Sequence, residues 1–201
     1  MYRSKFQLDQ ESFDGRRIWA DPNEMHRAIL ADIFRSDASS NHVLWRQVRD
    51  MLYVQSDIPP QGVPDGLHLR QTKDLGAFCG NLSEGTVLRY NLRAMPTRSI
   101  RAPKQGVRGH REFIRDERER IAWMMHRGEM AGCRILSCSE RNTSRSILDR
   151  RPEKGGRFQM TSVCFSGRLQ ITDADAFRKA LHQGIGRGKA FGCGLLFVVP
   201  C

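Results

Sequence analysis

The order of apolar and polar residues predicts a strand and then a helix at the start of the chain. Tyr2, Phe6 and Leu8 lie at mutually even positions, which favours a strand over residues 2–8. Asp21-Pro22 then provides an N-cap followed by a first-turn proline, and this pair opens a helix over residues 22–35. The apolar stripe expected along that helix contains Met25, Ala28, Ile29, Ile33 and Phe34.

The rest of the first half continues as strands and loops. Two short apolar runs, residues 42–45 and 51–55, predict a hairpin, and the prolines and glycines of residues 57–66 predict a loop. A weak helix is expected around residues 67–78, and the alternation over residues 86–94 predicts a further strand. Strand, helix, two strands, helix and strand is the ferredoxin-like order.

The second half shows a similar order of elements. The expected elements are a helix over 112–130, a strand over 133–138, a strand over 158–171 interrupted at Ser166-Gly167, a helix over 173–183 and a last strand over 195–199. In the first of these helices, the candidate buried residues are Ile114, Ile121, Met124 and Met125. The pattern therefore predicts an α+β protein with two tandem ferredoxin-like (RRM-like) βαββαβ domains, residues 1–95 and 96–201.

A glycine-rich segment, residues 184–196 (GIGRGKAFGCGLL), separates the last helix from the last strand. Its five glycines allow positive φ and close approach to another molecule, and successive N–H groups in such a loop can hold an anion. Arg187 and Lys189 add positive charge, so phosphate is the expected anion. A nucleotide loop runs from strand to helix, whereas this one follows a helix C-terminus. The alternative is a C-cap glycine with a flexible turn.

Charge is concentrated in the second half of the chain. The net charge is +11. Residues 1–95 hold 12 basic and 12 acidic side chains, and residues 96–201 hold 21 and 10. Such an excess, mostly of arginine, indicates a nucleic acid partner. Two segments, 101–111 and 141–157, are turn-prone and basic, and either could lie along RNA or be a solvated loop. The cations expected to contact RNA in the second segment are Arg141, Arg145, Arg150, Arg151, Lys154 and Arg157.

Cysteine and histidine spacing gives few further leads. None of the six cysteines is spaced C-x-x-C, which argues against a zinc ribbon or a redox motif, and Cys164 is expected to be a small core residue. No signal peptide or membrane span is expected, so the protein is expected to be cytoplasmic with reduced thiols. His26 lies beside the stripe of the first helix, where it is either a structural or a catalytic histidine.

These residues together resemble the CasE family, the endoribonucleases that process CRISPR transcripts in type I-E systems. The resemblance runs nearly end to end. Its motifs are Met1-Tyr-x-Ser-Lys5, Pro22-x-Glu-Met-His26-Arg27, Leu44-Trp-Arg46, Val54-Gln-Ser56, Leu92-Arg-Ala-Met-Pro96, Ile121-Ala-Trp123, Val163-Cys-Phe-x-Gly167 and Gly184-Ile-Gly-x-x-Lys-Ala-x-Gly-Cys-Gly-Leu-Leu196. The last block is the most specific, and the family has two ferredoxin-like domains in tandem.

The resemblance implies a cut at the base of the repeat hairpin without a metal ion or cofactor. The ribose 2′-OH attacks the adjacent phosphate and leaves a 2′,3′-cyclic phosphate and a 5′-hydroxyl, and the enzyme then stays with its product as a subunit of the Cascade complex. His26 matches the catalytic histidine of the family. Asn23, the second candidate catalytic residue, stands where the family often has a tyrosine. Its amide can hold a phosphate or orient a ribose, but it cannot replace a phenol in proton transfer. RNA contacts are implied for Arg27 and for Gly184, Gly186, Arg187, Gly188 and Lys189.

Two other functions stay open at this stage. Because of Asn23, the protein could instead be a non-cleaving subunit that binds and caps the guide RNA hairpin. A general tandem RNA-recognition module is a weaker alternative, because the aromatic-rich strand motif that stacks bases is absent.

Overall fold

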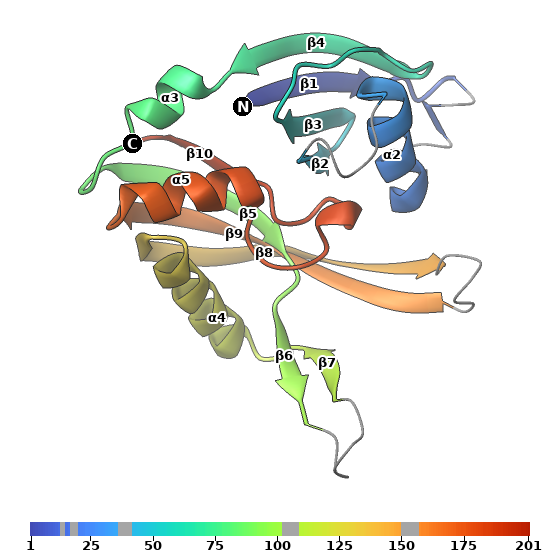
Figure 1. Cartoon of the computed structure of the whole chain (residues 1–201). Coiled ribbons are helices and arrows are strands. Elements are labelled where there is room, and N and C mark those ends of the chain that lie inside the picture. The colour runs from blue at the N-terminus through green and yellow to red at the C-terminus, as the bar shows by residue number, and fades with distance from the viewer. Residues whose placement is uncertain (13–14, 17–19, 36–41, 102–108, 150–156) are drawn as a thin grey trace.

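The first part of the chain forms a four-stranded antiparallel sheet (Figure 1). This computed structural model describes residues 1–12, 15–16, 20–35, 42–101, 109–149 and 157–201. The strands are β1 (Tyr2–Leu8), β2 (Leu44–Val48), β3 (Met51–Ser56) and β4 (Leu67–Asp74), in the order β2-β3-β1-β4. A short helix, α3 (Gly76–Gly80), follows β4.

The second part forms another four-stranded antiparallel sheet with two helices. Its strands are β5 (Val87–Ala94), β8 (Cys133–Asp149), β9 (Arg157–Ile171) and β10 (Leu196–Pro200), in the order β10-β5-β9-β8. The helices are α4 (Glu117–Met130) and α5 (Ala174–Gln183). A small hairpin of β6 (Thr97–Ile100) and β7 (His110–Phe113) lies between β5 and α4 in the chain. Both sheets have ferredoxin-like strand order, which confirms the expected fold class.

The helix α2 (Pro22–Ala28) begins and packs as its sequence predicts. Asp21 is its N-cap, and Oδ1 of Asp21 accepts from the backbone N–H of Asn23 at 2.8 Å. The chain continues as one turn of π-helix, η1 (Ile29–Ile33). All five residues of the expected apolar stripe are buried and pack on the first sheet: Met25, Ala28, Ile29, Ile33 and Phe34.

The helix expected around residues 67–78 is wrong. Residues 67–74 are strand β4, which pairs with β1 at the edge of the first sheet, and residues 57–66 form no helix. Only Leu67 of this strand is buried, so the segment lacks the apolar alternation by which a strand is recognised. The first unit therefore lacks the second helix of the ferredoxin-like order between β3 and β4.

The strand at residues 86–94 was expected to complete the first sheet, and that assignment is also wrong. As β5, it lies between β9 and β10 in the second sheet, where Leu92 pairs with Phe165 and with Leu196. By sheet membership, the first unit ends after β4, and the change of unit does not fall at Met95. Alternation identifies a strand but says nothing about which sheet it joins.

Several limits of the second unit differ from those expected. Helix α4 begins at Glu117 and not at residue 112. Strands β8 and β9 pair as a long hairpin, and β9 continues through Ser166-Gly167 without an interruption. Within α4, Arg120, Met124 and Gly128 are buried, whereas Met125 is 46% exposed, contrary to expectation.

Figure 1 shows the two sheets one above the other. Phe197 of β10 contacts side chains of the first sheet. The guanidinium carbons of Arg3 and Arg46 lie 4.9 and 5.5 Å from the centre of its ring. The ring of Tyr53 meets it edge-on at 5.2 Å. Burial lowers the pKa of Arg3 to about 10 and also lowers that of Arg46.

Arg46 connects the first sheet to the second by hydrogen bonds. One of its terminal nitrogens donates to Oδ1 of Asn91 at 2.5 Å, and the other donates to Sγ of Cys164 at 3.6 Å. Cys164 is therefore half-buried on the polar face between the sheets and is not the core residue that was expected. The apolar cores of the two units lie apart, with this polar contact between them.

Side chains of the first unit also form hydrogen bonds with the C-terminal turn of α5. Nε2 of Gln55 donates to the carbonyl of Leu181 at 2.7 Å, so a side chain of β3 pairs with a carbonyl of the last helical turn. One residue further on, Nε2 of His182 lies 2.5 Å from Oδ1 of Asp57. The N–H of His42 donates to the other oxygen of that carboxylate. Partial burial opposes ionisation of Asp57, but these two hydrogen bonds outweigh it and lower its pKa. The glycine-rich segment starts directly after this anchored turn.

Candidate RNA-binding and catalytic site

Helix α2 carries the three candidate residues of the first unit. His26 is half-buried next to the buried Met25, and its Nδ1 is shielded from solvent. Arg27 is exposed and forms an ion pair with Glu24 one turn earlier. An imidazole can both accept and donate a proton, so this position suits acid–base chemistry.

Asn23 takes part in the N-terminal cap of α2. Its side-chain Nδ2 donates to Oδ1 of Asp21 at 3.1 Å, and its backbone N–H donates to the same oxygen. The amide is thereby held close to the helix start, one turn before His26. Its carbonyl oxygen can accept a hydrogen bond, but a carboxamide is too weak an acid and too weak a base to transfer a proton at neutral pH.

The glycine loop, residues 184–194, has the backbone that its sequence predicts. All five glycines have positive φ, between 74° and 88°. A Cβ at Gly188 would lie 2.4 Å from Sδ of Met95, and one at Gly192 would lie 2.8 Å from the ring of Trp45. The glycines therefore allow the loop to pack closely against both units, which a flexible turn would not do.

Three successive N–H groups of the loop, at residues 186–188, are candidate donors to an anion. Gly186 and Gly188 have positive φ and Arg187 between them does not, an alternation that turns neighbouring N–H groups toward one side. None of these three N–H groups donates to another described residue. By contrast, the N–H of Gly194 donates to the carbonyl of Arg93, and the N–H of Ile185 donates to the carbonyl of Gly194. The arrangement at 186–188 suits a phosphate oxygen.

The two cations of the loop differ in their surroundings. Arg187 is exposed, whereas Lys189 is half-buried, and its burial lowers the pKa of the ammonium group. Lys189 opens a single turn of 3-10 helix, η3 (Lys189–Phe191), which lies against α2 and β2. The loop and the His26 helix are thus in contact, although they come from opposite ends of the chain.

The basic segment at 141–157 is described only in part. Arg141 is exposed on β8, and Arg145 and Arg157 are placed by their backbone pairing with Thr161 and Asp149. Three of the predicted contacts, Arg150, Arg151 and Lys154, lie outside the described residues.

The structure also reveals a basic pocket that the sequence alone did not define. It has a volume of about 830 Å³ and lies between the β6–β7 hairpin, the β8–β9 hairpin and the glycine loop. Of the predicted site residues whose side chains the structure describes, only Arg187 lies in its wall. Arg111 could have been found from the basic segment at 101–111, but Arg115 and Arg120 are brought there by the turn into α4. The residues that line the pocket are Met95, Thr97, Arg111, Glu112, Phe113, Arg115, Arg120, Thr143, Thr161 and Arg187.

Two further properties concern metals and membranes. All six cysteines are free. Among the described residues, no three histidine, cysteine, aspartate or glutamate side chains come together as a metal site would require. No helix in the described ranges has both the length and the apolar character that crossing a bilayer demands.

The fold and the cationic site define a tandem ferredoxin-like protein, and comparisons with known proteins agree. A family profile described as CRISPR associated protein matches residues 1–200. The CRISPR-associated endoribonuclease Cse3 of Thermus thermophilus is 31% identical over 217 aligned positions, which cover 100% of both chains. The CRISPR system Cascade subunit CasE of Escherichia coli is 34% identical over 131 positions, 59% of this chain and 61% of that one.

A solved structure extends this similarity to three dimensions. The structure of the endoribonuclease Cse3 bound to a 19-nucleotide RNA superimposes with a TM-score of 0.86 at 28% identity, covering 100% of each chain. This chain belongs to the CRISPR-associated protein family that contains Cse3 and CasE.

Proposed function

We propose that this protein is an endoribonuclease that cuts CRISPR precursor RNA at the base of the repeat hairpin and then stays bound to the product as a Cascade subunit. The observation that carries the proposal is the contact between the His26 helix and the 3-10 turn of the glycine loop. This contact supports a site in which His26 transfers protons beside the N–H donors and cations of the loop that suit phosphate. The names of the relatives, an endoribonuclease and a Cascade subunit, support the same reading.

The proposed reaction uses a nucleophile that the RNA itself carries. The ribose 2′-oxygen bonds to the adjacent phosphorus, its proton is lost, and the bond from phosphorus to the 5′-oxygen breaks. The 5′-oxygen takes up a proton, so the products are a 2′,3′-cyclic phosphate and a 5′-hydroxyl. His26 can accept the first proton or supply the second. Lys189 and the N–H groups at 186–188 offset the negative charge that develops on the phosphate.

The departure at Asn23 affects the rate of this reaction. A positioned acid or base contributes about 10²–10⁴-fold, so a chain with His26 but no second proton-transfer group at position 23 is expected to be slow. A slow enzyme suffices if each molecule cuts once and keeps its product.

The test is single-turnover cleavage of the repeat hairpin from the CRISPR array nearest the gene. His26→Ala is expected to lower the rate by about 10²-fold or more while RNA affinity is kept, because only the proton transfer is lost. His68→Ala, which removes an exposed histidine of β4, is the matched control and keeps the wild-type rate. EDTA is expected to have no effect. Equal rates for His26→Ala and wild type, or loss of cutting in EDTA, contradict the mechanism.

Asn23→Tyr is the complementary change. It restores a phenol one turn before His26, and we expect faster cleavage under the same conditions. A rate no higher than wild type shows that position 23 does not limit the reaction.

A second candidate function is a non-cleaving subunit that caps the guide RNA hairpin. The hydrogen bond from Asn23 Nδ2 to Asp21 favours it, because this amide serves the helix cap. Tight binding of the hairpin without any cut over hours would establish this function in place of the first.

The role of the glycine loop is tested by salt dependence. Arg187→Ala and Lys189→Ala each remove one expected phosphate contact, so each is expected to lower the slope of log K against log salt by about 0.7–0.9. Arg134→Ala, an exposed arginine of β8 outside the site, is the control. Unchanged slopes in both loop variants would show that the loop does not touch phosphate.

A further inference from the structure

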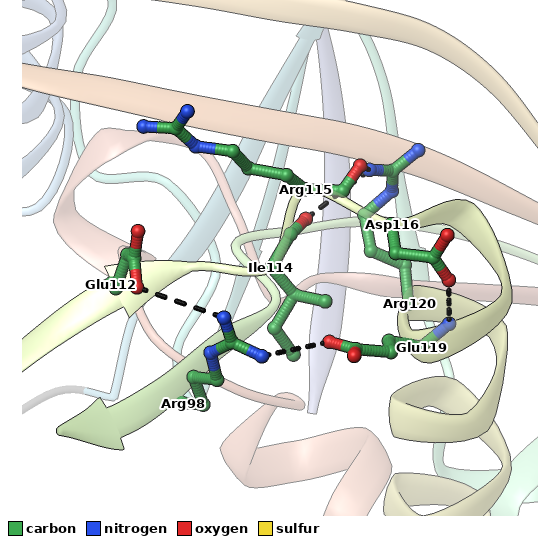
Figure 2. Close-up of polar contacts among 7 residues, drawn as sticks. All are labelled: Arg98, Glu112, Ile114, Arg115, Asp116, Glu119 and Arg120. Carbon is green, nitrogen blue, oxygen red and sulfur yellow. Dashed lines mark hydrogen bonds and ion pairs between the residues drawn. The ribbon is translucent and has the colours of Figure 1, made fainter.

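The basic pocket between the β6–β7 hairpin and the glycine loop has an excess of uncommitted positive charge. Figure 2 shows why the nearby acidic groups do not neutralise it. Arg98 lies 3.0 Å from Glu119 and 3.8 Å from Glu112, so both carboxylates are directed toward this arginine, whose single charge offsets one of theirs. Glu112 is then the one acidic residue in the pocket lining, against Arg111, Arg115, Arg120 and Arg187. Asp116 is the N-cap of α4 and accepts from the backbone N–H of Glu119.

The one deeply placed cation of the pocket is also paired. Arg120 donates to both carboxylate oxygens of Glu140, at 2.6 and 2.7 Å, and to the carbonyl of Ile114. This pair is nearly buried, with side chains 11% and 8% exposed. Arg120 therefore shapes the wall and adds little net charge.

Three guanidinium groups remain for a ligand. Arg111, Arg115 and Arg187 are exposed, and their side chains form no hydrogen bond or ion pair with another residue of the part of the chain that the structure describes. In Figure 2, the side chain of Arg115 extends away from the ion pairs of Arg98. Thr97, Thr143 and Thr161, which carry hydroxyl groups, line the same space. Such a set of donors binds a phosphate group.

The pocket is larger and more apolar than a bare phosphate needs. A volume of about 830 Å³ lies in the range of pockets that take small organic ligands. Phe113 and Met95 form an apolar part of its wall. Exposed guanidinium planes also stack on unpaired nucleobases. A phosphate with a base attached, that is a nucleotide, fits this lining better than an inorganic anion does.

The pocket lies next to the site on α2. Arg187 belongs to the wall of the pocket. Lys189 follows two residues later, so the two Cα atoms are at most about 7.6 Å apart. Lys189 is also the first residue of the 3-10 turn that contacts α2. Met95 lines the pocket and also touches Gly188, between these two residues. An RNA strand that leaves the His26 helix along the loop reaches the pocket within a few nucleotides.

We propose that this pocket binds an unpaired nucleotide of the RNA strand that flanks the hairpin. The proposal rests on the proposed function, which supplies the RNA. A base must leave the duplex to enter a pocket, so the ligand is single-stranded RNA next to the stem. The pocket thereby selects hairpins that carry a flank over bare hairpins, and it fixes the register of the strand at the His26 helix.

The test measures binding of fluorescent repeat RNA by anisotropy, with the His26→Ala protein so that the RNA stays intact. Three RNAs are compared: the hairpin alone, with a short 5′ flank, and with a short 3′ flank. We expect one of the two flanks to strengthen binding about ten-fold, which is the gain in affinity expected from one stacked base and its phosphate. Adding Arg111→Ala or Arg115→Ala removes most of this gain but leaves affinity for the bare hairpin within about two-fold. Arg134→Ala is the matched control and keeps the gain.

The outcomes separate this proposal from the proposed function. If neither flank strengthens binding, or if the pocket variants weaken the bare hairpin equally, the pocket proposal is overturned, even where wild type cuts normally. If wild type does not cut but the flank effect and its loss in the variants are seen, the pocket stands and the cleavage proposal fails. Uridine and adenosine monophosphates are added as competitors. Competition at micromolar concentration would assign the pocket to free nucleotides and overturn the proposal.

Discussion

At the scale of single residues, Gly192 and Gly85 share a backbone conformation but differ in what surrounds them. Their φ values are 74° and 83°, both in the left-handed region. A Cβ at Gly85 meets nothing within 4 Å, whereas one at Gly192 lies 2.8 Å from the buried ring of Trp45. Substitutions at these two glycines therefore separate the free-energy cost of the backbone conformation from the cost of the steric contact with Trp45.

Gly192→Ala is expected to lower the free energy of unfolding by about 2–4 kcal/mol, because it adds steric overlap to the backbone cost. Gly85→Ala is expected to cost about 1 kcal/mol, the backbone part alone. Urea unfolding of both variants measures the difference. Equal losses would mean that Trp45 moves aside freely and that the loop is not held by this contact.

The residues of the site were predictable to different degrees. The helical period around Met25 placed His26 correctly beside the buried stripe, and the glycines correctly predicted positive φ. The partners of the loop, Trp45 and Met95, could not be predicted, because close contacts between distant segments leave no periodic signal. Arg120 was missed for another reason, since its burial depends on Glu140, twenty positions later in a different element.

At the scale of elements, the Arg120–Glu140 pair joins α4 to β8. Arg120 also donates to the carbonyls of Ile114 and Arg115, and so fixes the turn from β7 into the helix (Figure 2). The hydrogen bonds to Glu140 raise the pKa of Arg120. The pair thus stabilises the wall of the basic pocket as well as the helix.

Arg120→Ala is expected to cost about 3–5 kcal/mol of unfolding free energy, because it leaves the carboxylate of Glu140 buried without its partner. The double change Arg120→Met with Glu140→Leu removes both charges at similar volume and is expected to recover most of that loss. Chemical denaturation of the single and the double variant measures the two losses in unfolding free energy. A double variant as unstable as the single one would indicate that the hydrogen bonds to the turn, and not the ion pair, dominate.

Element prediction succeeded where each element showed its own period and failed where tertiary pairing decided. The stripe of α2 and the first-turn acids of α5 were sufficient to find these helices. In β4, seven of eight residues are exposed at the sheet edge, so no apolar alternation marked the strand. The alternation of β5 correctly predicted a strand. Its partners, β9 and β10, are far away in the sequence, so assigning β5 to the sheet of the nearby first unit was wrong.

At the scale of the whole molecule, the contacts between the two units include Phe197, the half-buried Arg3 and the buried Arg46. Neither Arg3 nor Arg46 has a carboxylate partner among the described residues, and ring, amide, carbonyl and thiol groups surround them instead. Desolvated cations gain more from a ring face than exposed ones do. The ring of Phe197 therefore contributes directly to how the units are held together.

Phe197→Ala is expected to lower the unfolding free energy by about 2–4 kcal/mol, near the lower part of the range for aromatic truncation, because the ring is only partly buried. Val199→Ala, on the same strand and 49% exposed, is the control and is expected to change stability by no more than about 0.5 kcal/mol. Amide hydrogen exchange should show faster exchange in β1, β2 and β10 of Phe197→Ala. Exchange that accelerates only within β10 would argue against a role between the units.

The position of β5 has a consequence for how the protein is made on the ribosome. This strand needs β9 on one side and β10 on the other, and Leu92 finds its partner Leu196 only after the glycine loop has been synthesised. The first sheet can be completed as soon as β4 has emerged, whereas β5 stays without a neighbour until β9, which begins at Arg157, has been synthesised. Pairing of such distant strands is slow to form. A nascent or prematurely terminated chain therefore carries the His26 helix without the loop that contacts it, and under the proposed mechanism it can cut RNA only when synthesis has reached the last strand.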